Sequence, residues 1–234
     1  FFYFSTAYVC GKQDKIVKEE WLDKPKGFRN PYEESKWFAE KLLQQYIKDF
    51  DMPIITFRPA VIGTESKSKF NEIKKQTIYL HGRIIKKETE NQKEDKKIRL
   101  VGKPDTFINL ITIEDIVSII LKVRSLQDKS PIYNLANPFN CSAMSFLQGL
   151  QEIIGFKSGY EFVVGLDNKK LSEAEKSIYE KTKPYFAYNI DSNLRWDISN
   201  TNKLRKELKL VSKDDNWIKN HAKDFFLTIE NEEQ

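Results

Sequence analysis

Tyr32 and Lys36 stand four residues apart, a spacing that suits proton transfer. On a helix this spacing puts both side chains on one face, one turn apart. A cation about 5 Å from a phenol oxygen stabilises the phenolate by about 3 kcal/mol at an effective dielectric constant of about 20. The pair would then let Tyr32 give a proton to, or take one from, a carbonyl and its alcohol. Many helices carry Tyr-x-x-x-Lys by chance, so the pair alone leaves a purely structural role open.

The sequence predicts a helix that presents this pair, from Asn30 to about Phe50. Asn30 suits the N-cap, Pro31 the first helical position, and Glu33 the completion of a capping box. Apolar residues then recur at three-and-four spacing, which predicts one broad apolar face packed on a sheet. These residues are Trp37, Phe38, Leu42, Leu43, Tyr46, Ile47 and Phe50.

Two apolar strands flank the predicted helix. Residues 1–9 are aromatic and β-branched and end at Cys10-Gly11, and residues 52–59 form a compact apolar run closed by a proline. A strand, a helix and a second strand in succession indicate a βαβ unit with a parallel sheet. Further helices are predicted over 113–123, from Ser142 or Ser145 to about Gly155, and over 214–226, with short strands over 132–136 and 160–164.

The composition predicts a globular protein without a nucleic-acid partner or a membrane span. Hydrophobic residues make up 40% of the chain and aromatic residues 13%, which is enough to bury a core. The net charge is +5, but lysines and glutamates alternate along most of the chain, as on a solvated surface. Residues 83–103 are the most basic stretch and indicate an exposed loop, with a solvated acidic cluster from Glu88 to Asp95. No apolar run is long enough to cross a bilayer.

The cysteines and histidines predict neither a disulfide framework nor a metal site. Cys10 and Cys141 lie far apart and indicate ordinary thiols in a reducing cytoplasm. His81 and His221 lack a metal-ligand spacing, so we expect structural or exposed roles for both. The chain starts at Phe1 inside an apolar run, without the flanks of a secretory signal. We therefore expect a cytoplasmic protein whose first residue lies in the middle of a fold.

Three motifs in this order resemble the extended short-chain dehydrogenases and reductases. They are a Ser/Thr strand end at 5–11, the Tyr-x-x-x-Lys helix at 32–36 and an Arg-Pro strand end at 57–63. The resemblance implies an α/β fold: the C-terminal part of a Rossmann-like doubly wound parallel sheet, with a smaller, mostly helical substrate-binding lobe. Residues 1–64 would be the C-terminal part of the dinucleotide-binding domain. Residues 65–234 would combine the lobe with returning Rossmann elements, co-folded as one unit.

The same resemblance implies the roles of the site residues. Thr6, Tyr32 and Lys36 would be catalytic: Thr6 bonds the substrate oxygen, Tyr32 is the acid and base, and Lys36 holds the cofactor ribose. The cofactor would also contact Tyr32, Ser5 and the backbone of Pro59, Ala60, Val61 and Ile62. The implied cofactor is NADP or NAD, with NADP slightly favoured. The Gly-rich turn that cradles the pyrophosphate in this family is absent from the sequence, so we expect the chain to act as part of a larger enzyme.

Segments further along look like the male-sterility-type group, which includes fatty acyl-CoA reductases and carrier-protein thioester reductases. These segments are residues 107–117, 132–138, 184–186, 196–201 and 217–226. They imply an NAD(P)H-dependent reductase whose partner is a small-molecule or carrier-bound acyl substrate.

Two alternatives remain open at this point. A sugar-nucleotide epimerase or dehydratase of the same fold would need a cluster of cations for the diphosphate, for which Lys103, Lys122 and Arg124 are candidates. A truncated, non-catalytic remnant would leave sheet edges exposed, which favours a homo-oligomer.

Overall fold

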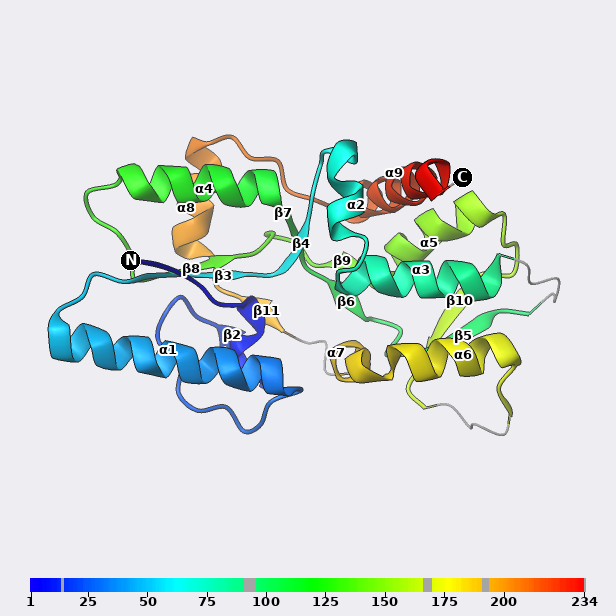
Figure 1. The fold of residues 1–234 in the computed structure, drawn as a ribbon, viewed down its shortest axis with the longest axis horizontal. Helices are drawn as coiled ribbons and strands as arrows, with labels where there is room; N and C mark the ends of the chain where they lie inside the picture. The colour runs from blue at the N-terminus through cyan, green and yellow to red at the C-terminus, as the bar shows by residue number, and fades with distance from the viewer. Residues whose placement is uncertain (14, 91–95, 166–169, 191–193, 234) are drawn as a thin grey trace. The chain divides into compact units, whose positions relative to one another are not determined.

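A computed structural model describes residues 1–13, 15–90, 96–165, 170–190 and 194–233, with side chains as far as residue 229. The chain forms two compact units, each assembled from three segments (Figure 1). Unit 1 comprises Phe1–Gly63, Asn109–Phe139 and Asn193–Ser212, and unit 2 comprises Thr64–Ile108, Asn140–Ser192 and Lys213–Gln234. The functional roles expected for residues 1–64 and 65–234 remain predictions.

Unit 1 is built on parallel strand pairs. Its central sheet has the order β1-β3-β8, with Phe4 beside Phe57 and Phe57 beside Tyr133. Two further parallel pairs, β4 with β7 and β2 with β11, complete the strands described for this unit. The strands are β1 (Phe2–Phe4), β2 (Ile16–Val17), β3 (Ile55–Pro59), β4 (Val61–Gly63), β7 (Leu110–Thr112), β8 (Ile132–Leu135) and β11 (Arg195–Trp196). The predicted βαβ unit with a parallel sheet is confirmed.

The opening strand is shorter than the predicted 1–9. After β1 the chain forms a 3-10 helix, η1 (Ala7–Cys10), because the Thr6 hydroxyl accepts a hydrogen bond from the backbone N–H of Tyr8 and caps it. Ala7, Val9 and Cys10 are all buried. These apolar residues resemble a strand in the sequence, but the structure buries them in a helical turn.

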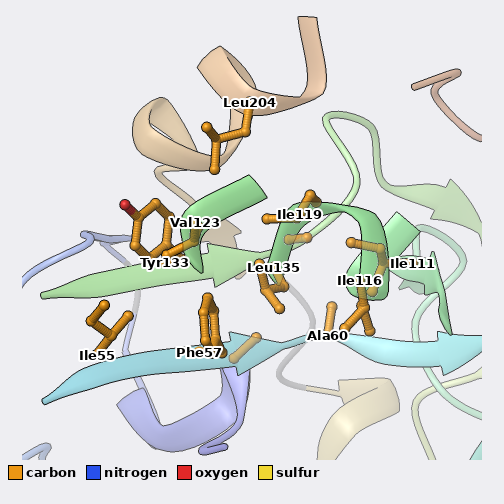
Figure 2. Close-up of a cluster of buried hydrophobic side chains, with 12 residues drawn as sticks. Ile55, Phe57, Ala60, Ile111, Ile116, Ile119, Val123, Tyr133, Leu135 and Leu204 are labelled. Atoms are coloured by element: carbon orange, nitrogen blue, oxygen red, sulfur yellow. The ribbon is translucent and has the colours of Figure 1, made fainter. Parts of the chain in front are cut away.

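Helices cover both faces of the unit 1 sheet. Figure 1 shows α4 (Ile113–Ser125) and α8 (Ser199–Glu207) on one side and α1 (Pro31–Phe50) on the other. Figure 2 shows the core on the α4 side, where Phe57 and Leu135 of the sheet meet Ile119 of α4 and Leu204 of α8. Asp115 in the first turn of α4 bonds buried Arg205 of α8, at 3.3 Å.

The predicted broad apolar face of α1 is wrong. Its buried residues are Glu33, Trp37 and Glu40. Four of the apolar residues are instead exposed by 41–68%: Phe38, Leu42, Tyr46 and Phe50. The helix turns two carboxylates inward because arginines from elsewhere in unit 1 neutralise them, as described below.

Unit 2 is mostly helical, and its described residues form two short strand pairs. Strands β5 (Ile98–Val101) and β10 (Tyr160–Val163) are parallel, and β6 (Phe107–Ile108) and β9 (Cys141–Ser142) are antiparallel. Helices α5 and α9 pack side by side (Figure 1). The helices are α2 (Phe70–Ile73), α3 (Thr77–Thr89), α5 (Ala143–Ile154), α6 (Glu173–Thr182), α7 (Phe186–Ile190) and α9 (Asp215–Glu233), with the 3-10 turns η2 (Lys67–Lys69) and η4 (Lys183–Tyr185).

The exposed loop predicted over 83–103 is wrong for most of its length. Residues up to Thr89 belong to α3, and Ile98–Val101 form β5. Ile78, Gly82 and Ile85 fall on one buried face of α3. This helical pattern was missed in the sequence because many charged residues lie on the other faces of the helix. Within the predicted acidic cluster, Glu88 bonds Lys181 and Glu90 bonds Lys86, while Glu94 and Asp95 lie outside the described residues. No helix in the described ranges is long and apolar enough to cross a membrane.

His81 of α3 makes the stability of the protein depend on pH. Burial lowers the pKa of His81 from 6.5 to about 4. Between these values the unfolded chain binds the proton and the folded chain does not, so the free energy of unfolding falls as pH drops from 6.5 to 4. At about 1.4 kcal/mol per pKa unit, the loss is about 3 kcal/mol.

We expect His81→Leu to remove this part of the pH dependence. The measurement is urea unfolding of parent and variant at pH 7, 6, 5 and 4. Carboxylates titrate equally in both proteins, so the difference between the two curves isolates His81. Parallel curves would contradict the assignment.

Candidate active site

The structure brings Tyr32 and Lys36 together at the start of α1. Asn30 caps the helix by accepting a hydrogen bond from the backbone N–H of Glu33 at 3.0 Å, as predicted. The Lys36 ammonium donates to the carbonyl oxygen of Phe4 at 3.0 Å and lies 5.8 Å from the centre of the Tyr32 ring. Tyr32 is 52% exposed, so its phenol is open to a ligand. The backbone at the end of β1 thus holds the ammonium beside an accessible phenol.

Ser5 and Thr6 follow β1 directly and are both buried. The Thr6 hydroxyl oxygen accepts the N–H of Tyr8 at 3.3 Å, which fixes its position. The Ser5 hydroxyl has no hydrogen-bond partner within the described part of the chain. A buried hydroxyl left without a partner is costly, so this atom fits a site that receives a polar ligand such as the implied cofactor or its substrate.

The Pro59–Ile62 segment lies at the same edge of the sheet. Because β1 and β3 run parallel with Phe4 beside Phe57, the residues after each strand emerge together at the carboxyl edge, where open α/β sheets bind ligands. The N–H of Ala60 donates to Leu135 and that of Val61 to Asn109, at 2.9 and 3.1 Å. The N–H groups of Ala60 and Val61 are therefore used by the fold.

A buried ion pair that sequence reasoning missed holds α1 on the sheet. Arg58 of β3 donates two hydrogen bonds to the Glu40 carboxylate, at 2.9 and 2.6 Å, and a third to the carbonyl oxygen of Lys18 at 3.2 Å. The side chains of Arg58 and Glu40 are 0% and 2% exposed. Glu40 lies one helical turn beyond Lys36. The sequence did contain a signal for this pair: Arg58 lies inside an apolar strand, and a buried charge needs a partner.

A second missed pair fixes the first turn of α1. The Arg29 guanidinium bonds both Glu33, at 3.3 Å, and the carbonyl oxygen of Gly11, at 2.8 Å. The Glu33 carboxylate also accepts the backbone N–H of Arg29, at 2.9 Å. Gly11 has a φ of 58°, and a Cβ there would collide with the carbonyl oxygen of Gly27, so only glycine suits this position. Arg29 thereby links Gly11, which follows η1, to Glu33, the residue next to Tyr32.

Other chemistries find little support at this site. Burial raises the pKa of the Cys10 thiol to about 11, so Cys10 is not a thiolate nucleophile at neutral pH. Both cysteines are buried and free. Within the described ranges, no group of three or more His, Cys, Asp or Glu residues is placed to hold a metal ion.

The cations considered for a sugar diphosphate come from both units. Lys122 of α4 bonds Glu207 of α8 at 2.9 Å, and Arg124 is exposed on the same helix. Lys103 belongs to unit 2. Lys122 thus has a structural partner within unit 1.

A protein-family model described as Male sterility protein matches residues 1–120. The match includes the Ser-Thr strand end, Tyr32, Lys36 and the Arg-Pro strand end. No curated protein matches the sequence.

Solved structures share the fold of the chain. The terminal R domain from the myxalamid PKS-NRPS biosynthetic pathway has a TM-score of 0.68 at 19% identity, over 99% of this chain and 57% of that one. UDP-glucuronic acid 4-epimerase from Bacillus cereus, solved with NAD, gives 0.62 at 19% identity over 100% and 62%. RMD from Pseudomonas aeruginosa, solved with NADPH, gives 0.59 at 16% identity over 99% and 67%.

The chain spans 57–67% of the length of these three structures. At such low identities the likeness concerns the fold, and it confirms the predicted α/β, Rossmann-like class with parallel strands.

Proposed function

The chain belongs to the male sterility protein family, within the extended short-chain dehydrogenase/reductase superfamily, and from this we propose that it forms the proton-transfer part of an NAD(P)H-dependent reductase. The substrate we propose is an acyl thioester or a related carbonyl, presented as a small molecule or on a carrier. The cofactor would be NADP or NAD, since structural neighbours have been solved with NAD and with NADPH.

The observation that carries this proposal is the position of the Lys36 ammonium. It is fixed on the Phe4 carbonyl oxygen and lies beside the exposed Tyr32 ring. With the ammonium held beside it, the Tyr32 phenol can give its proton to an alkoxide that develops nearby. A hydroxyl group at the end of β1, on Thr6 or Ser5, would hydrogen-bond the same oxygen.

The implied nicotinamide cofactor would supply the hydride when bound. Lys36 would hold its ribose hydroxyls, and Ser5 with the Pro59–Ile62 segment would line its nicotinamide end. Two observations support this assignment: the Ser5 hydroxyl has no hydrogen-bond partner among the described residues, and Pro59–Ile62 lies at the carboxyl edge of the sheet.

The proposed reductase activity is tested with the whole protein that carries this chain. Purified protein is mixed with NADPH or NADH and octanoyl-CoA, and the loss of absorbance at 340 nm and the formation of aldehyde or alcohol are followed. We expect cofactor oxidation that depends on the thioester. Interconversion of UDP-sugars without thioester reduction would favour the epimerase, and failure to bind either cofactor would favour the non-catalytic remnant.

Lys36→Met is expected to weaken cofactor binding by the whole protein. Loss of a hydrogen bond from a charged group costs about 1.5–3 kcal/mol, which corresponds to about a 10- to 100-fold higher Kd. NADPH fluorescence measures the Kd. Lys41→Met is the matched control, since Lys41 lies on the same helix with its ammonium 5.3 Å from the centre of the Trp37 ring. Equal Kd values for the two variants would refute the role given to Lys36.

A further inference from the structure

The Lys36 ammonium lies over a second tyrosine, Tyr3 of β1. Its nitrogen atom is 5.3 Å from the centre of the Tyr3 ring and 5.8 Å from the centre of the Tyr32 ring. Both distances fall within about 6 Å, the range over which the face of an aromatic ring attracts a cation. The bond to the Phe4 carbonyl oxygen is a third contact, so β1 and α1 both hold the ammonium.

The pleat of β1 directs Tyr3 towards α1. Phe2 and Phe4 contact Phe57, with 5.4 and 5.6 Å between ring centres, and Phe57 belongs to the core on the α4 side of the sheet. Successive side chains of a strand point to opposite faces. Tyr3 therefore lies on the face that α1 covers (Figure 1), where it is partly buried.

The Tyr3 phenol does not act as a second acid beside Tyr32. Burial raises the pKa of Tyr3 above its usual value of 10.0, and the charges of Glu40 and Tyr32 raise it further. Tyr3 is therefore a neutral phenol at neutral pH, and its ring attracts the cation without neutralising it. The charge of Lys36 stays available to a ligand.

A single hydrogen bond does not fix a lysine ammonium, because it sits on a flexible stem of four carbons. The ammonium has three N–H donors, and the Phe4 carbonyl oxygen accepts one of them. We propose that Tyr3 is a positioning residue: its ring keeps the Lys36 ammonium at the end of β1, where the other N–H groups reach the ribose hydroxyls of the cofactor. The ribose belongs to the proposed function, on which this inference rests, whereas the contact between Tyr3 and Lys36 is present without a cofactor.

Cofactor binding by the whole protein tests the role of the ring. An exposed cation–π contact contributes about 0.5–1 kcal/mol, so Tyr3→Leu should raise the NADPH Kd about two- to fivefold, measured by NADPH fluorescence. Tyr3→Phe keeps a ring under the ammonium and should restore the parent Kd. Phe2→Leu is the matched control, because it removes a ring from the other face of β1. A parent-like Kd in Tyr3→Leu, or an equal loss in Phe2→Leu, would overturn the proposal.

A double variant separates an effect through Lys36 from a general effect on the fold. Once Lys36→Met has removed the ammonium, the Tyr3 ring has no cation to hold. Adding Tyr3→Leu to Lys36→Met should therefore raise the NADPH Kd no further. An increase equal to that of Tyr3→Leu in the parent protein would mean that Tyr3 acts independently of Lys36, and the proposal would be wrong.

A nuclear magnetic resonance measurement without cofactor distinguishes failure of this inference from failure of the proposed function. The whole protein is labelled with carbon-13 at lysine, and the ε-methylene signal of Lys36 is identified by its absence in Lys36→Met. We expect an upfield position in the parent and in Tyr3→Phe, and a downfield move in Tyr3→Leu. An unmoved signal in Tyr3→Leu would overturn the positioning role. The expected move would support that role even if neither cofactor binds, in which case the proposed function fails.

Discussion

Replacing Tyr32 with phenylalanine is expected to lower the turnover of the whole protein by about 10²- to 10⁴-fold, the range typical of losing a positioned general acid. The change deletes one hydroxyl from a half-exposed ring and keeps the ring beside Lys36. Cofactor binding should change little by comparison, because the lysine remains. The measurement is kcat with NADPH and octanoyl-CoA at saturation, alongside the NADPH Kd and the urea unfolding midpoint.

Tyr46→Phe is the matched control for this experiment. Tyr46 is also an exposed tyrosine of α1, but it lies more than three turns from Tyr32 and next to Phe50, with 5.5 Å between ring centres. We expect normal turnover from it. If Tyr32→Phe stayed within a few-fold of the parent enzyme, the assignment of the acid would be wrong, whatever the result for cofactor binding.

Arg58→Met is expected to destabilise the protein by about 3–5 kcal/mol, the cost of leaving a buried carboxylate without its partner. Glu40 has no route to water, since its side chain is 2% exposed. Urea unfolding measures the loss. Lys122→Met, which breaks the more exposed Lys122–Glu207 pair, should cost less than about 1 kcal/mol.

The double variant Arg58→Met with Glu40→Met distinguishes the ion pair from simple packing. Removing both charges leaves no unpaired ion, so the double variant should recover most of the stability lost by the single one. Additive losses would mean that Arg58 acts through its packing and its bond to the Lys18 carbonyl oxygen. The single variant should also lower turnover, because Glu40 lies on the helix that carries Tyr32 and Lys36.

The helix that presents the candidate site was predictable because its signals are local. Asn30 and Pro31 mark the start of α1, and Ser142 and Gly155 mark the ends of α5 in the same way. Such caps act within one turn, so they can be identified from neighbouring residues alone. The resemblance to a family implied that Thr6, Tyr32 and Pro59 serve one site, and the parallel register of β1 and β3 brings the chain after Phe4 and the chain after Phe57 to the same edge of the sheet.

The buried side of α1 was not predictable in this way. Apolar spacing pointed to the face with Phe38 and Leu42, whereas the structure buries Glu33 and Glu40. Their burial depends on arginines, one of them 18 residues away in sequence at Arg58. The spacing of hydrophobic residues does not indicate which charged side chains will pair across the fold. The same reasoning explains α3, whose lysines and glutamates obscured its buried face.

The division of each unit into three chain segments has a consequence for biosynthesis. The core of unit 1 is completed by Leu204 and that of unit 2 by α9, so neither core can close until nearly the whole chain has left the ribosome. Contacts between residues so distant in sequence form slowly, because the entropy of closing long loops must be overcome first. Nascent chains that stall before residue 204 would leave the strands around Phe57 and Leu135 uncovered, and such chains would depend on chaperones to avoid aggregation.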